Sequence, residues 1–236
     1  MIETQVIPYR DQDASLNGFL AWDTSQTSNR PGVLIVHGGA GLDDHARRRA
    51  RRFAELGFVA FACDMYGEGV VGNRERVIPK INQFRSDPEL LCQRAQVGLD
   101  ILSHHPNLDG RLAAVGYCFG GMTVLELARS GTDLAAVVSV HGALKTVRPA
   151  VPGAIRSKVL VCHGALDPHV PMTHVASFVE EMILSGADWQ VVLYGNAMHG
   201  FTHETATGEQ PGVAYHAPSD LRSSLAIQLF LGEVFQ

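Results

Sequence analysis

Short apolar runs alternate with longer amphipathic segments along most of the chain. The apolar runs lie at residues 33–36, 58–63, 112–117, 135–140, 159–162 and 189–194. Their Val, Ile and Leu residues follow one another with little polar alternation, which is typical of strands buried on both faces. Segments with the length and apolar spacing of helices lie at residues 43–56, 88–104, 119–130, 173–185 and 219–231. This alternation predicts an α/β fold with a mainly parallel central sheet and helices on both of its faces.

Two further strands are predicted before this alternation begins. They lie within residues 5–22, and we expect them at an edge of the sheet. No linker divides the predicted sheet, so we expect a single domain over residues 1–236, with its core at about residues 31–235. Residues 68–88 are interpreted as a lid segment.

Composition and charge narrow the class of protein. The chain is 46% hydrophobic, enough for a sizeable core, and its net charge of −5 favours neither nucleic acid nor an anionic membrane as a partner. No apolar run approaches the roughly 18 residues that span a bilayer, and the N-terminus does not resemble a signal peptide. The four cysteines show no CxxC spacing, which favours a reducing, cytoplasmic compartment. A homodimer is left open.

The stretch "GYCFGG" places Cys118 at a predicted corner between a strand and a helix. Its glycines match the G-x-nucleophile-x-G elbow, in which the nucleophile has strained backbone angles and small neighbours relieve crowding. The following helix points its N-terminus at the corner, which favours a thiolate. An inert buried cysteine is the alternative for this residue considered alone.

Two later loops carry partners for such a nucleophile. Asp167 follows the apolar run at 159–162, in "HGALDPHVP", and His199 follows the run at 189–194, in "GNAMHGF". Both loops lie at the carboxyl ends of predicted strands, at the same edge of a parallel sheet as Cys118. The chain order of nucleophile, acid and histidine is that of α/β-hydrolases. The sequence therefore predicts a Cys118-His199-Asp167 catalytic triad.

An oxyanion hole requires backbone N–H groups aimed at the reacting oxygen. We expect one from Phe119 and a second from Gly39, in the "VHGGAGL" loop after the first core strand. The residues predicted to contact the substrate are His37, Gly38, Tyr117, His141 and His203. For His37, an orienting hydrogen bond at the end of a strand is a sufficient alternative.

Taken together, "GYCFGG", "HGALDPHVP", "AMHGF", "CDMYGEG" and "GVAYHAPSD" resemble the dienelactone hydrolase family of α/β-hydrolases. The resemblance runs from about residue 31 to residue 235. The cysteine elbow is its most specific part, because most α/β-hydrolases use serine. The resemblance implies an α/β-hydrolase fold and a Cys-His-Asp hydrolase of small esters or lactones that needs no metal or organic cofactor.

The chain departs from this family at three positions. Dienelactone-cleaving members carry a Glu that contacts the resting thiol, where this chain has Gly38. They also carry two arginines that would hold a substrate carboxylate, where this chain has Glu68 or a neighbour and His203. Basic residues within 68–88, Arg74, Arg76 or Lys80, are possible substitutes, although solvated charges are the simpler interpretation. Hydrolysis of other esters, lactones or thioesters is therefore expected in preference to dienelactone.

Two alternatives remain beside the hydrolase. Eleven histidines invite a metal site, but His199 and His203 are predicted on a loop, without the helical spacing of a ligand pair, so no metal is expected. A ligand-binding or redox-sensing protein on the same fold would use Cys118 without turnover. The accompanying Asp167 and His199 favour the hydrolase.

Overall fold

The structure is a computed structural model that describes the backbone of residues 1–236 and every side chain except that of Arg74. The chain forms two compact units, Met1–Val115 and Gly116–Gln236. The expectation of one domain stays a prediction. Among the residues so described, no helix combines the length and the apolarity needed to cross a membrane.

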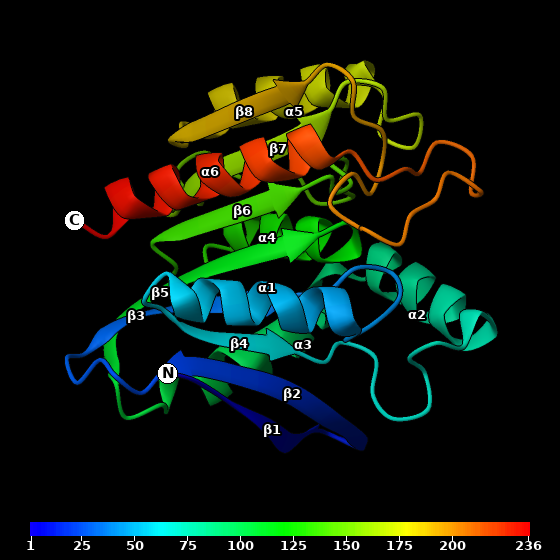
Figure 1. Cartoon of the computed structure of the whole chain (residues 1–236). Coiled ribbons are helices and arrows are strands. Elements are labelled where there is room, and N and C mark those ends of the chain that lie inside the picture. The colour runs from blue at the N-terminus through cyan, green and yellow to red at the C-terminus, as the bar shows by residue number, and fades with distance from the viewer. The chain divides into compact units, whose positions relative to one another are not determined.

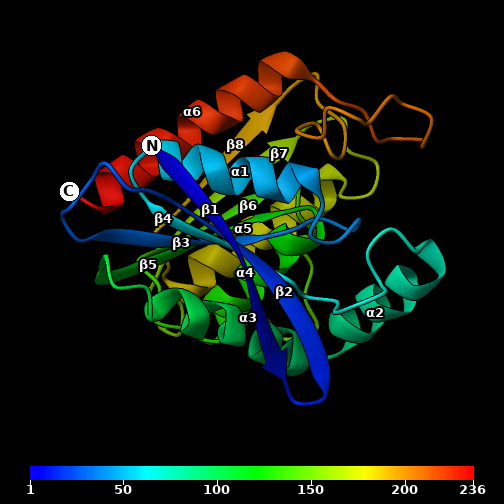
Figure 2. The same cartoon turned by 60° about the horizontal axis from the view of Figure 1, so that its bottom comes forward.

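The first unit contains four complete strands, most of a fifth strand and three helices. Its elements are β1 (Ile2–Asp11), β2 (Ala14–Asp23), β3 (Arg30–Val36), α1 (Asp44–Glu55), β4 (Val59–Cys63), α2 (Arg74–Ser86), α3 (Pro88–Ser103) and the greater part of β5 (Leu108–Tyr117). The strand order is β1-β2-β4-β3-β5. The two N-terminal strands pair antiparallel at the edge, and β3 pairs parallel with β4. Figure 2 shows the β1–β2 hairpin as a long twisted ribbon.

The second unit repeats a parallel strand and helix pattern. It holds α4 (Phe119–Arg129), β6 (Ala136–Val140), β7 (Lys158–Gly164), α5 (Met172–Ser185), β8 (Trp189–Tyr194) and α6 (Ala217–Val234). Its strands follow the order β6-β7-β8, and both neighbouring pairs are parallel. The prediction of a mainly parallel sheet is therefore confirmed.

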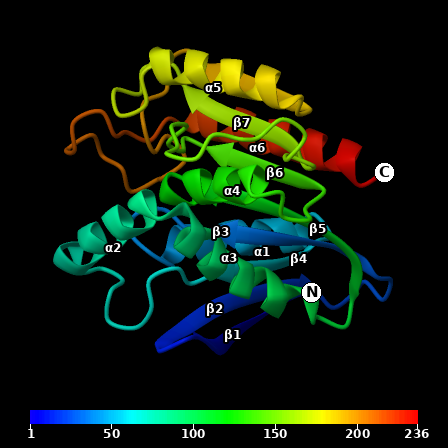
Figure 3. The same cartoon turned by 180° about the vertical axis from the view of Figure 1, so that it is seen from behind.

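Helices cover both faces of the strands within each unit. Figures 1 and 3, taken from opposite sides, show α1 on one face of β3 and β4 and α3 on the other. In the second unit α6 lies on one face and α4 and α5 on the other. Every residue of β4 and of β6 is buried as a result. The unbroken apolar runs are thus explained, because a strand covered on both faces has no solvent side.

The 68–88 segment contains a helix that the sequence analysis did not predict. Helix α2 begins after Asn73, whose side chain accepts a hydrogen bond from the Arg76 N–H, and it includes Pro79. Its Glu, Lys and Arg residues are not separated cleanly from its apolar ones, so it lacks the apolar stripe that identifies a surface helix. Its function as a lid stays a prediction.

Candidate active site

Cys118 occupies a sharp corner between β5 and α4. The strand ends at Tyr117 and the helix begins at Phe119, while Cys118 has φ 54° and ψ −111°. A positive φ is strained for a residue with a β-carbon and is typical of functional corners. A β-carbon added at Gly116 would collide with the carbonyl of Gly120. Gly116 is therefore required by the close approach of strand and helix, as the sequence analysis proposed.

Three side chains from separate loops form a continuous line of polar contacts. The Sγ of Cys118 lies 3.1 Å from Nε2 of His199, and Nδ1 of His199 lies 2.7 Å from Oδ2 of Asp167. Asp167 follows β7 and His199 follows β8, so each residue stands beyond the carboxyl end of its own strand. The geometry is that of a nucleophile, a base and a carboxylate that orients the base.

The carboxylate of Asp167 is buried but well supported. Its second oxygen, Oδ1, accepts hydrogen bonds from the backbone N–H groups of His169, at 2.8 Å, and Val170, at 3.0 Å. Burial alone would raise the pKa of Asp167, but the hydrogen bonds from His199 and from these two N–H groups lower it below its ordinary value. Asp167 is therefore a carboxylate at neutral pH.

His199 favours its protonated form. Burial alone would lower its pKa, but hydrogen bonds to Asp167 and to the Cys118 sulfur raise that pKa to about 10. An imidazolium between a carboxylate and a thiolate satisfies both of its N–H groups. A histidine with a raised pKa beside a thiol is the arrangement typical of a reactive cysteine.

The backbone around His199 is held by the chain that follows it. The His199 N–H donates to the Gly212 carbonyl at 3.0 Å, and the Ala214 N–H donates to the His199 carbonyl at 3.2 Å. We call residues 207–216 the strap. A β-carbon at Gly212 would collide with Pro168, the neighbour of Asp167. The strap therefore contacts the loops that carry His199 and Asp167, a contact that the stretch "GVAYHAPSD" did not by itself predict.

The other predicted site residues of the second unit gather around His141. The His141 ring centroid lies 6.1 Å from that of Tyr117, 5.6 Å from His199 and 5.7 Å from His203. His141 is fully buried, and its Nδ1 and Nε2 contact the Cys118 N–H and the Thr202 hydroxyl. Substrate contact by these side chains stays a prediction. Thr202 itself was missed, because an isolated threonine carries no sequence signal.

The oxyanion-hole candidates lie in different units. Phe119 is the first residue of α4, so its backbone N–H lies at the N-terminus of the helix. Gly39 belongs to the first unit, with Gly38 and His37. The buried His37 ring donates from Nδ1 to the Gly38 carbonyl at 2.7 Å and accepts at Nε2 from the Met65 N–H at 3.1 Å. These are the orienting hydrogen bonds considered as the alternative for His37.

The positions that differ from dienelactone-cleaving enzymes also belong to the first unit, apart from His203. Glu68 accepts from the Asn17 side chain at 3.3 Å, and Arg76 donates to the Gly69 carbonyl at 3.1 Å. Lys80 lies 3.5 Å from the Gln83 side chain. The side chain of Arg74 lies outside the described residues. A substitute clamp for a substrate carboxylate stays a prediction.

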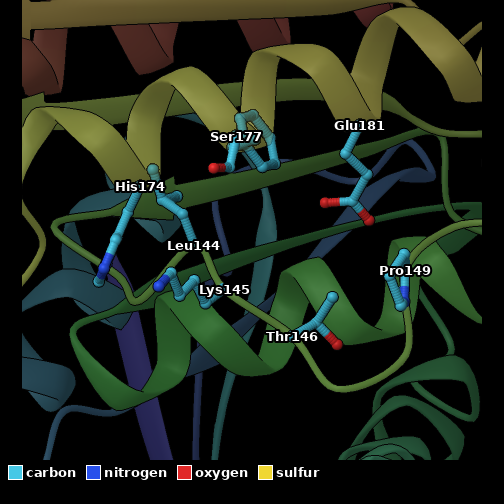
Figure 4. Close-up of a pocket in the computed structure, with 8 residues that line it drawn as sticks. Leu144, Lys145, Thr146, Pro149, His174, Ser177 and Glu181 are labelled. Atoms are coloured by element: carbon cyan, nitrogen blue, oxygen red, sulfur yellow. The ribbon is translucent and has the colours of Figure 1, made fainter.

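A separate cavity of about 150 Å³ lies between residues 144–149 and α5. Figure 4 shows the nitrogen-bearing ends of Lys145 and His174 at one end and Glu181 at the other. The Glu181 carboxylate is already bound by the Arg129 guanidinium, at 2.7 and 2.8 Å. Cys118, Asp167 and His199 do not line this cavity. The Glu181 carboxylate that does line it is already paired with Arg129. We therefore place the candidate chemistry at Cys118.

The chain is similar to known proteins in both sequence and fold. Residues 16–235 match the family model described as the dienelactone hydrolase family. The solved structure of m3DLH is 40% identical, with a TM-score of 0.93 over 100% of this chain and 99% of that one. A dienelactone hydrolase-like promiscuous phosphotriesterase from metagenomic libraries is 39% identical, with the same TM-score and coverage. A Caenorhabditis elegans protein described as uncharacterised is 36% identical over 150 residues, 61% of this chain and 94% of that protein. These similarities confirm the predicted α/β-hydrolase fold.

Proposed function

Because this chain belongs to the dienelactone hydrolase family, we propose that it hydrolyses small carboxylic esters, lactones or thioesters with a Cys118-His199-Asp167 triad. One observation carries the proposal. The thiol, the imidazole and the carboxylate form an unbroken line of contacts of 3.1 and 2.7 Å, on loops that follow three different strands. A binding protein has no need of an oriented base beside its thiol.

The first half of the proposed reaction acylates the enzyme. The Cys118 thiolate attacks the substrate carbonyl carbon, a C–S bond forms, and the carbonyl electron pair moves to oxygen. The N–H groups of Phe119 and Gly39 are proposed to stabilise that oxyanion. When the intermediate collapses, the C–O bond to the leaving group breaks, and the departing alkoxide takes the proton from His199. The products of this half are an alcohol and a thioester on Cys118.

The second half regenerates the enzyme. Neutral His199 removes a proton from water, and the resulting hydroxide attacks the thioester carbon. The C–S bond breaks, the acid product leaves, and the thiolate again faces a protonated His199. Asp167 accepts from Nδ1 throughout, which keeps Nε2 directed at the sulfur.

Substrates without a carboxylate are favoured by the residues that this chain lacks. Gly38 replaces the Glu and His203 replaces an Arg of the dienelactone-cleaving pattern. The guanidinium of an Arg is the usual bidentate partner of a substrate carboxylate. We therefore propose neutral short-chain esters and lactones in preference to dienelactone.

The test compares wild type with Cys118→Ala in the hydrolysis of 4-nitrophenyl acetate, 4-nitrophenyl butyrate and small lactones. The proposal requires that Cys118→Ala lose about 10³-fold or more in kcat/KM, as expected when a nucleophile is removed. Cys92→Ala is the matched control, because Cys92 is a partly exposed cysteine on α3 in the other unit. Equal rates in wild type and Cys118→Ala would overturn the triad and favour the binding or redox-sensing alternative.

A second candidate activity is the hydrolysis of neutral phosphotriesters. It is favoured by the relative described as a promiscuous phosphotriesterase, which is 39% identical over the whole of this chain. The same thiolate would form an S–P bond as an aryloxide leaves, and water would then release the phosphodiester. Release of 4-nitrophenol from diethyl 4-nitrophenyl phosphate tests this activity. A rate that is unchanged in Cys118→Ala would remove it from the candidates.

A further inference from the structure

We infer that His141 and Thr202 form a positioning pair that holds the backbone of Cys118 at a set distance from the loop of His199. This inference rests on the proposed function, because it assigns the pair to the same site. Its evidence is independent of the direct contact between Cys118 and His199. The inference does not depend on the predicted contact between His141 and the substrate.

The first observation is a shared hydrogen bond at the nucleophile. The N–H of Cys118 points to both the Val140 carbonyl, at 2.9 Å, and Nδ1 of His141, at 3.1 Å. A ring nitrogen that accepts from an N–H group carries no proton of its own. The neutral His141 ring therefore carries its proton on Nε2. That N–H lies 2.8 Å from Oγ1 of Thr202, so it donates to the hydroxyl.

The second observation is where the two ends of this bridge lie. Thr202 is three residues beyond His199, on the same loop after β8. The elbow and the base loop are thus joined twice, once from Sγ to the His199 ring and once from the Cys118 backbone through His141 to Thr202. Two hydrogen-bonded connections between the same two loops restrict their rotation as well as their separation, whereas a single connection leaves the loops free to rotate.

The third observation is that His141 also contacts the strand that leads to the acid. Its backbone N–H donates to the Cys162 carbonyl, at 2.8 Å, near the end of β7. His141 has φ 41°, a left-handed conformation that is uncommon for a residue with a β-carbon. The strain is explained if the conformation is needed to reach the elbow, β7 and the base loop at once. His141 therefore contacts all three segments that present the triad.

Burial makes these hydrogen bonds strong constraints. His141 is 0% exposed and Thr202 is 1% exposed. Solvent water therefore does not take the place of a lost hydrogen-bond partner. A buried donor without an acceptor is costly and moves to find another partner. Removing the Thr202 hydroxyl would take this acceptor from the His141 Nε2–H, next to the ring of His199, whose centroid lies 5.6 Å away.

The experiment compares Thr202→Val with Thr202→Ser, in a Cys92→Ala background so that Cys118 is the accessible thiol. Valine keeps the shape of the side chain without the hydroxyl, whereas serine keeps the hydroxyl. Two readouts are measured. The first is the rate of alkylation by iodoacetamide between pH 5 and 10, which needs no turnover. The second is kcat and KM for a 4-nitrophenyl ester.

The inference expects Thr202→Val to shift the alkylation profile and to lower kcat by about 10-fold, with a smaller change in KM, because misplaced reacting groups lose rate more than binding. Thr202→Ser should stay near wild type in both readouts. A merely structural role would change the folded fraction and leave the alkylation profile and KM unchanged. If Thr202→Val keeps the profile and kcat of the wild type, or if serine behaves as valine does, the inference is overturned.

His141→Asn keeps the inference testable if the valine variant does not fold. Asparagine accepts from the Cys118 N–H and tolerates a positive φ, but it is too short to reach Thr202, so it should shift the profile as valine does. An unshifted profile overturns the positioning role. The proposed function fails separately, if the wild type hydrolyses none of the substrates. A shifted profile in such an inactive protein would still support the positioning pair.

Discussion

The Nε2 of His199 lies 3.1 Å from the Sγ of Cys118, a residue 81 positions earlier in the chain. The contact joins a strained corner to a loop that a following segment holds by its backbone. It pairs a base with raised pKa and a thiol at a helix N-terminus. Substitutions of the residues that support this contact, such as Asp167 and Gly212, should therefore change the activity.

Asp167→Asn should leave the fold intact and reduce kcat by about 10³- to 10⁴-fold, because the amide no longer stabilises the His199 imidazolium. The hydrogen bond that His199 donates to Asp167 helps to raise the pKa of His199 to about 10. Losing the carboxylate lowers that pKa, so the alkaline limb of the kcat/KM profile should move to lower pH. Steady-state rates between pH 5 and 11 measure the shift, and an unmoved alkaline limb would contradict the role of Asp167.

Gly212→Ala should impair the site through Pro168. Gly212 has φ 77°, and a β-carbon there would collide with the Pro168 ring next to Asp167. Gly208→Ala is the matched control, since Gly208 has φ 87° and open space around its β-carbon position. Both changes carry a backbone cost of about 1–2 kcal/mol. Gly212→Ala alone should also lower kcat, by about 10-fold or more. Equal kcat in the two variants would show that the strap does not position the triad.

Arg129→Met should destabilise the second unit strongly. The Arg129 guanidinium is buried between Glu126, at 2.9 Å, and Glu181, at 2.7 Å. Removing it leaves two carboxylates without their cation, which costs about 3–5 kcal/mol for a broken buried pair. Urea unfolding at pH 7 measures the loss. Arg52→Met, at an exposed pair with Glu55, is the control and should change the free energy of unfolding by less than about 1 kcal/mol.

The loss of stability in Arg129→Met should depend on pH. Burial alone would raise the pKa of Glu181, but Arg129 lowers it below its ordinary value of 4.5. A depressed carboxyl pKa contributes stability above pH 4.5, and this contribution is lost as the pH falls through the folded-state pKa. The stability difference between wild type and Arg129→Met should therefore narrow below pH 4.5. A constant difference between pH 7 and pH 3 would contradict this ion pair.

Much of the fold could be predicted from the sequence because its signals are local. Buried strands such as β4 appear as unbroken apolar runs, since both of their faces are covered. Helix α2 was missed for a local reason as well. Its polar and apolar residues are mixed around the helix and Pro79 interrupts the pattern, so no apolar stripe marks it.

The sequence by itself determined the strand and helix alternation, the glycine-flanked corner at Cys118, and the order of Cys118, Asp167 and His199 along the chain. These features lie within short stretches, where backbone geometry and turn chemistry limit the choice of residue. Only the tertiary structure decided which distant residues lie against them. Thr202 reaches His141 across 61 positions, and Gly212 meets Pro168 from the strap. Neither contact could be predicted from the sequence, because a contact between distant segments depends on how the strands and loops pack.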